Sequence, residues 1–327
     1  MDTPTPHSPL PSGGACRLVD RGVIRASGAD AASFLHGQLS NDVSRLDAAH
    51  ARLAAYCTPQ GRMLASFVYA RAGAGELWLS TSADVLAPTL KRLSMFVMRA
   101  QAKLSDASAE LAVIGLAGEA AAAWLGEAAP AAPWDKADRD GAIVIRLLPA
   151  RQDGTDVPAW LWIGPVAQAE ALQAALPALD AAQWQRIELA TGVAQIVAAT
   201  SGQLVPQMLN YELVGGVDFR KGCYPGQEIV ARSQYLGKLK RRGFLLAGAA
   251  AMRPGQEVYW SGDAGQPAGL IAAAAPEFGG GHVALAELKI AVTQSGTLHL
   301  GAADGPVLAL QPLPYALPHE AEPAAAG

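Results

Sequence analysis

The sequence predicts an α+β protein that ends in a small β-barrel, and three observations support this fold class. Strand-like and helix-like segments interleave up to about residue 240, yet some neighbouring strands are joined by short turns, as in antiparallel pairs. The glycine-rich loops of parallel nucleotide-binding folds, GxGxxG and GxxxxGK followed by Ser or Thr, do not occur. After residue 240, short apolar segments alternate with Gly, Pro and Asp, which is typical of small barrels.

The elements of the first half follow from apolar spacing and turn residues. Asp30 precedes apolar residues at helical spacing, so we expect a helix within 30–43. Thr-Pro-Gln-Gly at 58–61 is typical of a turn between two strands. Residues 83–100 are amphipathic, and we expect their helix to begin beyond Pro88, which donates no N–H. The predicted strands are 22–28, 51–57, 62–71 and 76–82.

The second half repeats the mixture of strands and helices before the composition changes. We expect strands at 109–118, 142–148 and 159–164, a short Ala-rich helix after the first of them, and a helix at 165–176. A Pro-rich start without a basic or apolar leader reads as a tail, not as a signal peptide. The predicted organisation is a disordered tail at 1–17, an α+β region of two intertwined subdomains at 18–240, a barrel at 241–317 and a disordered tail at 318–327.

Composition limits the classes of function. The chain has 327 residues and a formal net charge of −4, so no overall field would attract nucleic acid or an anionic membrane. No apolar run reaches the roughly 18 residues of a membrane span. The three cysteines are widely spaced and form no CxxC, which indicates a reducing cytoplasm and no self-sufficient zinc or iron–sulfur site. The six histidines are scattered, and we expect surface or packing roles for them.

Residues 218–242 form a local cationic segment around one cysteine. They contain seven of the chain's 25 Lys and Arg residues, which suits phosphates, polyglutamate tails or RNA. Arg220 and Lys221 precede Cys223, and nearby cations favour the thiolate that acts as a nucleophile, redox centre or metal ligand. The alternatives are a solvated run of charge and an inert buried cysteine. Gly222 and Pro225-Gly226 favour an exposed turn.

Pro-Gly-Gln-Glu occurs twice in the chain. At 254–257 it precedes an apolar run and predicts a turn that leads into a strand. The copy at 225–228 follows Cys223, and an ordinary turn is one interpretation of it as well.

Two weaker patterns suggest a site for a flat heterocycle. Arg186 and Glu188 are two residues apart, so on an extended segment they would share a face, where the carboxylate accepts two N–H groups of an aminopyrimidinone. A surface ion pair is the alternative. Tyr56, at the end of a predicted strand, has a ring that would stack on a heterocycle or fill the core.

Together these motifs resemble a known family. The stretch KGCYPGQE, with GQLVPQMLN and GGVDF before it and ARSQYLGKLKRR after it, resembles the YgfZ folate-binding family, which is related to the glycine-cleavage T-protein. GADAASFLHGQLSNDV and AAYCTPQGRM extend the resemblance over most of residues 20–250. It implies two ferredoxin-like α+β domains and a C-terminal small β-barrel around a central folate-sized hole.

The resemblance also implies a function and a set of site residues. It implies a tetrahydrofolate-binding accessory protein for iron–sulfur cluster assembly or repair, which indirectly supports tRNA modification. The implied partners are iron–sulfur client enzymes or assembly factors, and tRNA is a further candidate. Cys223 and Lys221 are the implied functional pair. The implied cofactor-binding residues are Tyr56, Arg186, Glu188, Tyr224, Gln227, Glu228 and Arg232.

One departure separates this chain from aminomethyl transfer. T-proteins carry a Gly-Gly-x-x-Asp-Asp stretch, whereas Leu64 and Ala65 stand at the matching acidic positions here. Without a carboxylate to steer the amine, transfer chemistry loses its central group. The chain is therefore not expected to be a conventional enzyme. A folate-dependent one-carbon transferase and a tRNA-binding module at 232–242 stay as alternatives.

Overall fold

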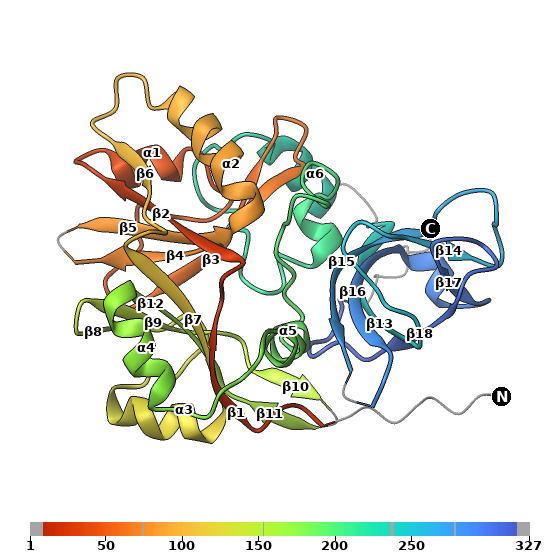
Figure 1. Cartoon of the computed structure of the whole chain (residues 1–327). Helices are drawn as coiled ribbons and strands as arrows, with labels where there is room; N and C mark the ends of the chain where they lie inside the picture. Colours follow the sequence, from red (N-terminus) through yellow and green to blue (C-terminus); the bar gives the residue numbers. More distant parts are fainter. Residues whose placement is uncertain (1–8, 74, 153, 236–238, 278, 319–327) are drawn as a thin grey trace, which may run out of the picture.

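The computed structural model describes residues 9–73, 75–152, 154–235, 239–277 and 279–318 (Figure 1). Its first sheet has the order β3-β4-β5-β2-β6, and every neighbouring pair is antiparallel. Helices α1 and α2 follow β2 and β5. The bounds are β2 (Arg21–Ser27), α1 (Ala31–His36), β3 (Ala51–Cys57), β4 (Met63–Ala72), β5 (Glu76–Ser82), α2 (Ala83–Phe96) and β6 (Lys103–Asp106).

The second sheet has the order β1-β7-β12-β9-β8 and is also antiparallel throughout. The hairpin β10 (Ala150–Gln152) and β11 (Thr155–Val157) stands apart from it. The bounds of the other elements are β1 (Gly13–Arg17), β7 (Leu111–Ala117), α3 (Gly118–Leu125), the 3₁₀ turn η1 (Gly126–Ala128), β8 (Lys136–Arg139), β9 (Ala142–Arg146), β12 (Ala159–Pro165) and α4 (Val166–Ala174).

Both sheets are built on the ferredoxin-like β-α-β-β-α-β plan with one extra edge strand each. In the first, β2, β4, β5 and β6 are the four strands of the plan, and β3 pairs with β4 at the edge. In the second, the corresponding strands are β7, β9, β12 and β1, with β8 at the edge. Its fourth strand therefore comes from the start of the chain, so the two domains are intertwined.

Residues 13–17 correct the predicted tail. They form β1, which pairs with β7 and is mostly buried. Composition at the Pro-rich start did not reveal this strand, because its partner lies about a hundred residues further along. Residues 1–8 and 319–327 of the predicted tails lie outside the described residues.

The layers stack helix, sheet, sheet, helix (Figure 1). One apolar cluster fills the space between the first sheet and its helices, and another lies between the second sheet and α3 and α4. The largest cluster joins the facing sides of both sheets to helix α5 (Ala181–Ala190) and to one side of the barrel. Alternation along the strands decides which cluster a residue joins: Leu53 and Ala55 face the largest cluster, while Ala54 and Tyr56 face the helices.

The C-terminal region is a closed barrel in the order β13-β16-β15-β14-β17-β18, with its own apolar interior. The predicted boundary at 240 falls one residue before the first barrel strand. The bounds are β13 (Arg241–Gly248), β14 (Glu257–Trp260), β15 (Gly269–Pro276), β16 (His282–Lys289), η3 (Ile290–Thr293), β17 (Leu298–Leu300) and β18 (Val307–Gln311).

Three helices differ from the sequence expectations. Helix α2 begins at Ala83 and continues through Pro88, because Val85 and Leu86, before the proline, are buried and hold its first turn in the core. Residues 181–190 form α5 and are not extended, because Asp180 and Gln183 make a reciprocal capping box. The Pro-Gly-Gln-Glu at 225–228 opens helix α6 (Gln227–Tyr235), whereas the second copy leads into β14 as expected.

The remaining short element is η2 (Pro206–Leu209), which precedes the segment that carries Cys223. Among the residues that the structure describes, no helix combines the length and apolar character needed to span a membrane.

Candidate functional site

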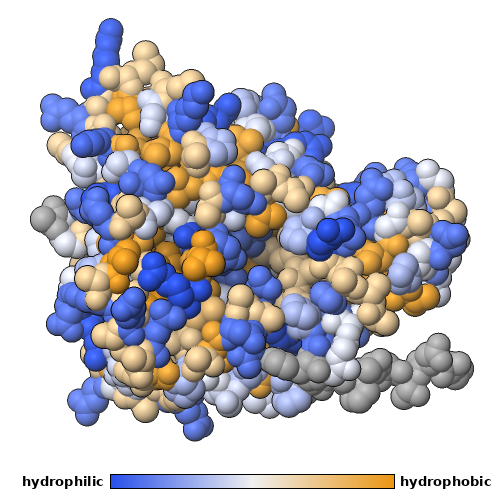
Figure 2. Space-filling view, viewed as in Figure 1, coloured by the Kyte–Doolittle hydropathy of each residue, from blue (hydrophilic) through white to orange (hydrophobic). Residues whose placement is uncertain are grey.

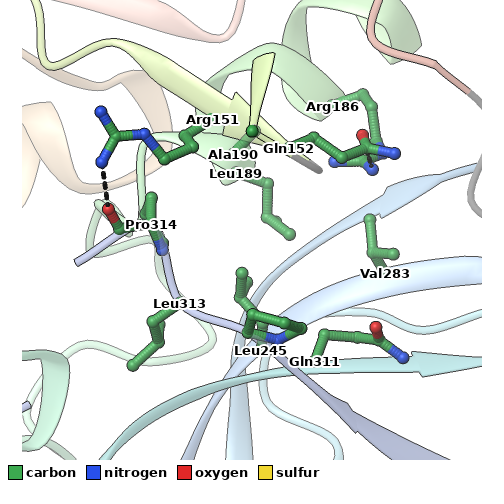
Figure 3. A pocket seen from close by; sticks show the side chains of 12 residues that line it. Arg151, Gln152, Arg186, Leu189, Ala190, Leu245, Val283, Gln311, Leu313 and Pro314 are labelled. Atoms are coloured by element: carbon green, nitrogen blue, oxygen red, sulfur yellow. Dashed lines mark hydrogen bonds between the residues drawn. The ribbon is translucent and has the colours of Figure 1, made fainter. Parts of the chain in front are cut away.

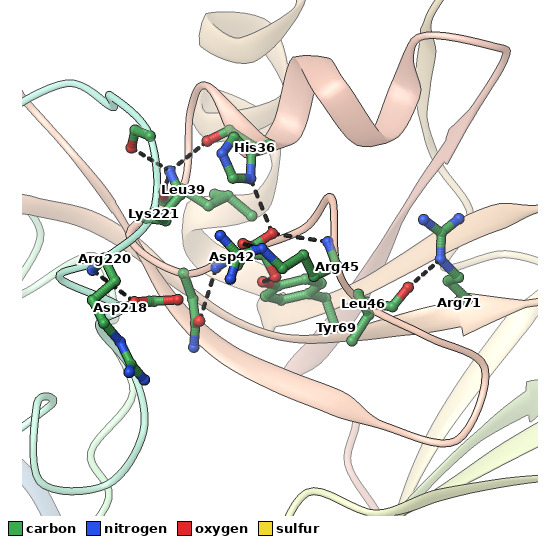
Figure 4. Close-up of polar contacts among 12 residues, drawn as sticks. His36, Leu39, Asp42, Arg45, Leu46, Tyr69, Arg71, Asp218, Arg220 and Lys221 are labelled. Carbon is green, nitrogen blue, oxygen red and sulfur yellow. Dashed lines mark hydrogen bonds and ion pairs between the residues drawn. The ribbon is translucent and has the colours of Figure 1, made fainter.

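Lys221 ties the Cys223 loop (residues 218–226) to the end of α1 (Figure 4). Its ammonium donates to the carbonyl oxygens of His36 and Leu39, at 2.6 and 3.0 Å, and to that of Gly222 at 3.1 Å. The ammonium also lies 4.8 Å from the centre of the Tyr224 ring, a cation–π contact. These contacts make Lys221 a positioning residue for the loop.

The environment of Lys221 opposes its charge. Burial lowers its pKa to about 8, and this desolvation outweighs the opposite influence of Asp42, Asp218 and Cys223. Tyr224, beside it, is 8% exposed, and burial raises the pKa of its phenol. The ring therefore stays neutral and contributes packing and its π face.

Cys223 is the exposed thiol of the chain. Cys16 and Cys57 are buried, and burial raises the pKa of Cys16 to about 11 and that of Cys57 to about 12. Those two thiols are therefore shielded and held protonated, whereas Cys223 is open to solvent and to a partner. The exposed turn predicted for Cys223 is what the structure shows.

His36 and Asp42 adjoin the Cys223 loop, and sequence reasoning missed them. His36 Nδ1 lies 3.2 Å from Asp42 Oδ1, and its Nε2 lies 3.2 Å from where a Cβ on Gly222 would stand (Figure 4). The Asp42 pKa is lowered although burial acts to raise it, because the backbone N–H of Arg45 and the charges of His36 and Arg45 stabilise the carboxylate. Both residues belong to the FLHGQLSND stretch, but only the fold shows that this stretch lies next to residues 221–223.

The rest of the KGCYPGQE stretch shapes the start of α6. Gly226 has φ +83°, and a Cβ there would collide with the backbone of Thr58 and Gly61, so the loop packs on the 58–61 turn. Gln227 Oε1 accepts from the Tyr224 N–H at 3.3 Å, which makes it a local cap. Glu228 and Arg232 are exposed on α6.

Arg186 and Glu188 do not share a face, which corrects the sequence expectation. Two residues on a helix are about 200° apart, not aligned as on a strand. Arg186 Nε donates to Glu277 Oε1 at 2.7 Å, toward the barrel. Glu188 accepts from Arg21 Nη2 through both oxygens, at 2.6 and 2.7 Å, toward the first domain.

Each of these side chains lines a different hollow beside α5. A pocket of about 310 Å³ lies between α5 and the barrel, with Leu189, Leu245 and Val283 directed into it and Arg186 at its rim (Figure 3). A cavity of about 110 Å³, lined by Glu188 and Arg21, lies on the other side of α5. Figure 2 shows the surface hollowed between the α+β part and the barrel.

Curated relatives match almost the whole chain. The tRNA-modifying protein YgfZ of Sodalis glossinidius is 31% identical over 327 residues, covering 97% of this chain and 96% of the relative. The protein of the same name from Edwardsiella ictaluri is 32% identical over 336 residues, covering 96% and 98%. The chain belongs to the YgfZ family. No family model matches it.

A solved structure agrees with the fold. The crystal structure of glycine cleavage system aminomethyltransferase T from Bartonella henselae superposes with a TM-score of 0.68, covering 93% of this YgfZ-family chain and 86% of the other. The sequence identity is 14%, so this likeness concerns the fold alone. The predicted combination of two α+β domains and a barrel is confirmed.

The cavity beside Glu188 has polar groups that suit the ring edge of a folate. Arg21 Nη1 and Gln195 Oε1 are buried without a hydrogen-bond partner, so a donor and an acceptor are available beside the Glu188 carboxylate. Pockets that enclose a whole drug-sized ligand measure roughly 300–1,000 Å³. At about 110 Å³, this cavity takes the ring end at most.

Tyr56 is not part of that cavity in this YgfZ-family member. It is 1% exposed and packs between the first sheet and its helices. Ile187 and Leu189 of α5 belong to the apolar cluster on the opposite face of the same sheet. The structure therefore does not bring Tyr56 to Glu188, because strand alternation turns its ring into the core.

Proposed function

We propose that this chain is an accessory protein that supports tRNA modification through iron–sulfur cluster assembly or repair, with Cys223 as its functional thiol. The observation that carries the proposal is the exposure of Cys223 on an anchored loop, while the other two cysteines are buried. The printed name of the relatives, tRNA-modifying protein, supports the link to tRNA. A cytoplasmic location, where thiols stay reduced, belongs to the same proposal.

In this proposal the cluster is cargo and not a resident group. No set of three or more His, Cys, Asp and Glu side chains within the described ranges is placed to hold a metal. A cluster needs about four ligands, so a single thiol completes a site only together with a partner protein. Cys223 would lose its proton, and its thiolate sulfur would coordinate an iron ion that a client enzyme or assembly factor also holds.

Tetrahydrofolate is the proposed small ligand, held by Glu188, Arg21 and Gln195. When bound, it would supply a reduced pterin, which can carry one-carbon groups. The carboxylate would accept N–H groups of the ring, and the Arg21 guanidinium orients that carboxylate by donating to both of its oxygens.

Aminomethyl transfer is not favoured. Leu64 and Ala65 follow Met63 at the start of β4, and neither carries a carboxylate for the amine. The structural likeness to aminomethyltransferase T concerns the fold alone. This chain lacks the acidic group that the transfer chemistry needs.

The thiol role is tested in cells that carry only a variant of this chain. We expect Cys223→Ala to lower the amount of a tRNA nucleoside made by an iron–sulfur enzyme, while Cys16→Ala, which removes a buried thiol, leaves it unchanged. Equal nucleoside levels in wild type and Cys223→Ala would overturn the thiol role.

The folate role is tested separately by calorimetry with tetrahydrofolate. Loss of a hydrogen bond to a charged group weakens binding by about tenfold or more, so Glu188→Gln should do so. Glu110→Gln, an exposed carboxylate paired with Arg25, is the control and should bind as wild type. Unchanged binding by Glu188→Gln would remove Glu188 from the site.

A further inference from the structure

A third hollow lies away from α5, where the two domains and the Cys223 loop meet. It has a volume of about 420 Å³, within the range of ligand pockets. Its walls come from β3, the loop before β8, the segment before Cys223 and the end of α6. The lining residues are Asn41, Arg52, Trp134, Gly215, Val217, Asp218, Phe219, Arg220 and Tyr235.

Three aromatic side chains from distant parts of the sequence converge there. Phe219 and Tyr235 meet edge to face, with ring centres 5.8 Å apart and planes at 69°. Tyr235 is 69% exposed, so most of its ring is open to a ligand. The Trp134 indole N–H has no acceptor within the part of the chain that the structure describes, so a donor is available beside the rings.

The backbone at Trp134 is held in a strained conformation. Its φ is +71°, which is rare for a bulky residue. Two backbone hydrogen bonds impose it: Ala51 donates to the Trp134 carbonyl at 2.7 Å, and the Trp134 N–H donates to Arg146 at 2.8 Å. These bonds join the edge of the first sheet to the second domain, and they fix the indole at the junction. Such strain is typical of sites where a side chain must be held in one place.

The cations of this hollow are available for an anion. Neither Arg52 nor Arg220 makes a side-chain ion pair with any described residue, and Figure 4 shows the Arg220 side chain extending away from the Lys221 anchor. The one lining carboxylate, Asp218, accepts from the Arg220 backbone N–H at 2.8 Å. Arg232 lies three residues before Tyr235 on α6, so both lie on the same side of that helix.

We propose that this hollow, the Trp134 pocket, binds a nucleotide of single-stranded RNA. The rings of Tyr235 and Phe219 offer stacking surfaces to a base, as in other single-strand binding proteins, and the free arginines suit its phosphate. Arg232 on the neighbouring turn of α6 provides a contact for the next phosphate, which favours a strand over a free mononucleotide. The base is read weakly, because stacking accepts any base.

The pocket adjoins the functional loop. Arg220 in the pocket wall and Cys223 are three residues apart in the same anchored loop, so an RNA bound there would contact the loop that carries the thiol. The proposed RNA site deepens the proposed function. Only the expectation that the bound RNA is tRNA rests on that function. RNA binding itself requires neither Cys223 nor folate.

Fluorescence anisotropy of labelled octa-adenylate with the full chain, at low salt, tests the proposal. Tyr235→Ala should weaken binding about five- to hundredfold, since stacking on one ring is worth that much. Arg220→Ala should weaken binding and reduce the slope of log K against log salt by about 0.7, the effect of one phosphate contact. The matched controls are Phe96→Ala, an exposed aromatic on α2, and Arg253→Ala, an exposed arginine near the barrel. Both should bind as wild type.

Three outcomes would overturn the proposal. An affinity of Tyr235→Ala within about twofold of wild type would remove the stacking role of Tyr235. An equal loss of affinity in the Phe96→Ala control would make the effect non-specific. Displacement of the RNA by tetrahydrofolate would assign the pocket to folate. Cys223→Ala should bind RNA normally, so a failed thiol role and a failed RNA site are distinguishable.

Discussion

Gly226 of the Cys223 loop lies directly against Gly61 of the 58–61 turn. A Cβ added to Gly226 would stand 2.6 Å from the Cα of Gly61 and closer still to the carbonyl oxygen of Thr58. Both glycines have positive φ, +83° and +73°. Two motifs that are distant in the sequence are thus one packed unit, and the position of Cys223 depends on it.

We therefore predict that Gly226→Ala lowers the unfolding free energy more than the same substitution at a glycine where only the positive φ opposes a side chain. Gly202, with φ +77° and no atom within 4 Å of an added Cβ, is the matched control. A non-glycine residue in this region costs about 1–2 kcal/mol, and overpacking adds about 1–3 kcal/mol at Gly226 only. Urea unfolding of the two variants measures the difference. Equal losses of stability would contradict the close packing.

The cysteines should differ in reactivity in the native protein. Iodoacetamide should modify Cys223 and leave Cys16 and Cys57 unmodified, because those two are buried and their pKa values are raised to about 11 and about 12. Mass spectrometry after a short exposure at pH 7.5 locates the label. Modification of Cys57 at a rate comparable to Cys223 would show that the first domain opens readily.

Regular patterns in the sequence predicted most of the elements, and long-range contacts explain most of the errors. The strands of the first sheet and the barrel follow from alternation and glycine turns. Strand β1 was missed because its partner is remote, and α5 because the Asp180–Gln183 capping box was not recognised. Because the segment was expected to be extended and not helical, Arg186 and Glu188 were expected to share one face of it.

The site was predicted in part. The Cys223 loop and the 58–61 turn were both identified from sequence, but their contact through Gly226 was not. Neither His36 beside Gly222 nor Trp134 beside Tyr235 follows from any local pattern, because the fold alone brings these segments together. The spacing of residues along the sequence does not predict a pocket whose walls come from several distant segments.

Lys221 should give the stability a distinctive dependence on pH. Its pKa is lowered in the fold, from 10.5 to about 8, so between these values the unfolded chain binds more protons at this residue than the folded chain. Stability from Lys221 therefore rises as pH increases from about 8 toward 10.5, and the burial penalty is fully present below pH 8. The unfolding free energy of wild type minus that of Lys221→Met should increase between pH 7.5 and 9.5. A constant difference would contradict the shift.

The barrel is fastened to the segment before Cys223 by a buried ion pair. Arg242 Nη1 donates to Glu212 Oε1 at 2.6 Å and to Asn210 Oδ1 at 3.1 Å, and the side chains of Arg242 and Glu212 are 8% and 4% exposed. Burial raises the pKa of Glu212, while the Arg242 charge acts to lower it. Removal of the arginine would leave a buried carboxylate without its counter-charge.

We predict that Arg242→Met lowers the unfolding free energy at pH 7 by about 3–5 kcal/mol. The loss should shrink as pH falls toward 5, because the raised pKa of Glu212 lets the folded state take up a proton before the unfolded state does. Arg242→Met with Glu212→Gln should recover much of the stability, since no buried charge is left. Arg151→Met, which breaks an exposed pair with Asp156, is the control and should cost at most about 1 kcal/mol. Urea unfolding at pH 5 and 7 measures all four proteins, and a pH-independent loss in Arg242→Met would mean that Glu212 is not the group responsible.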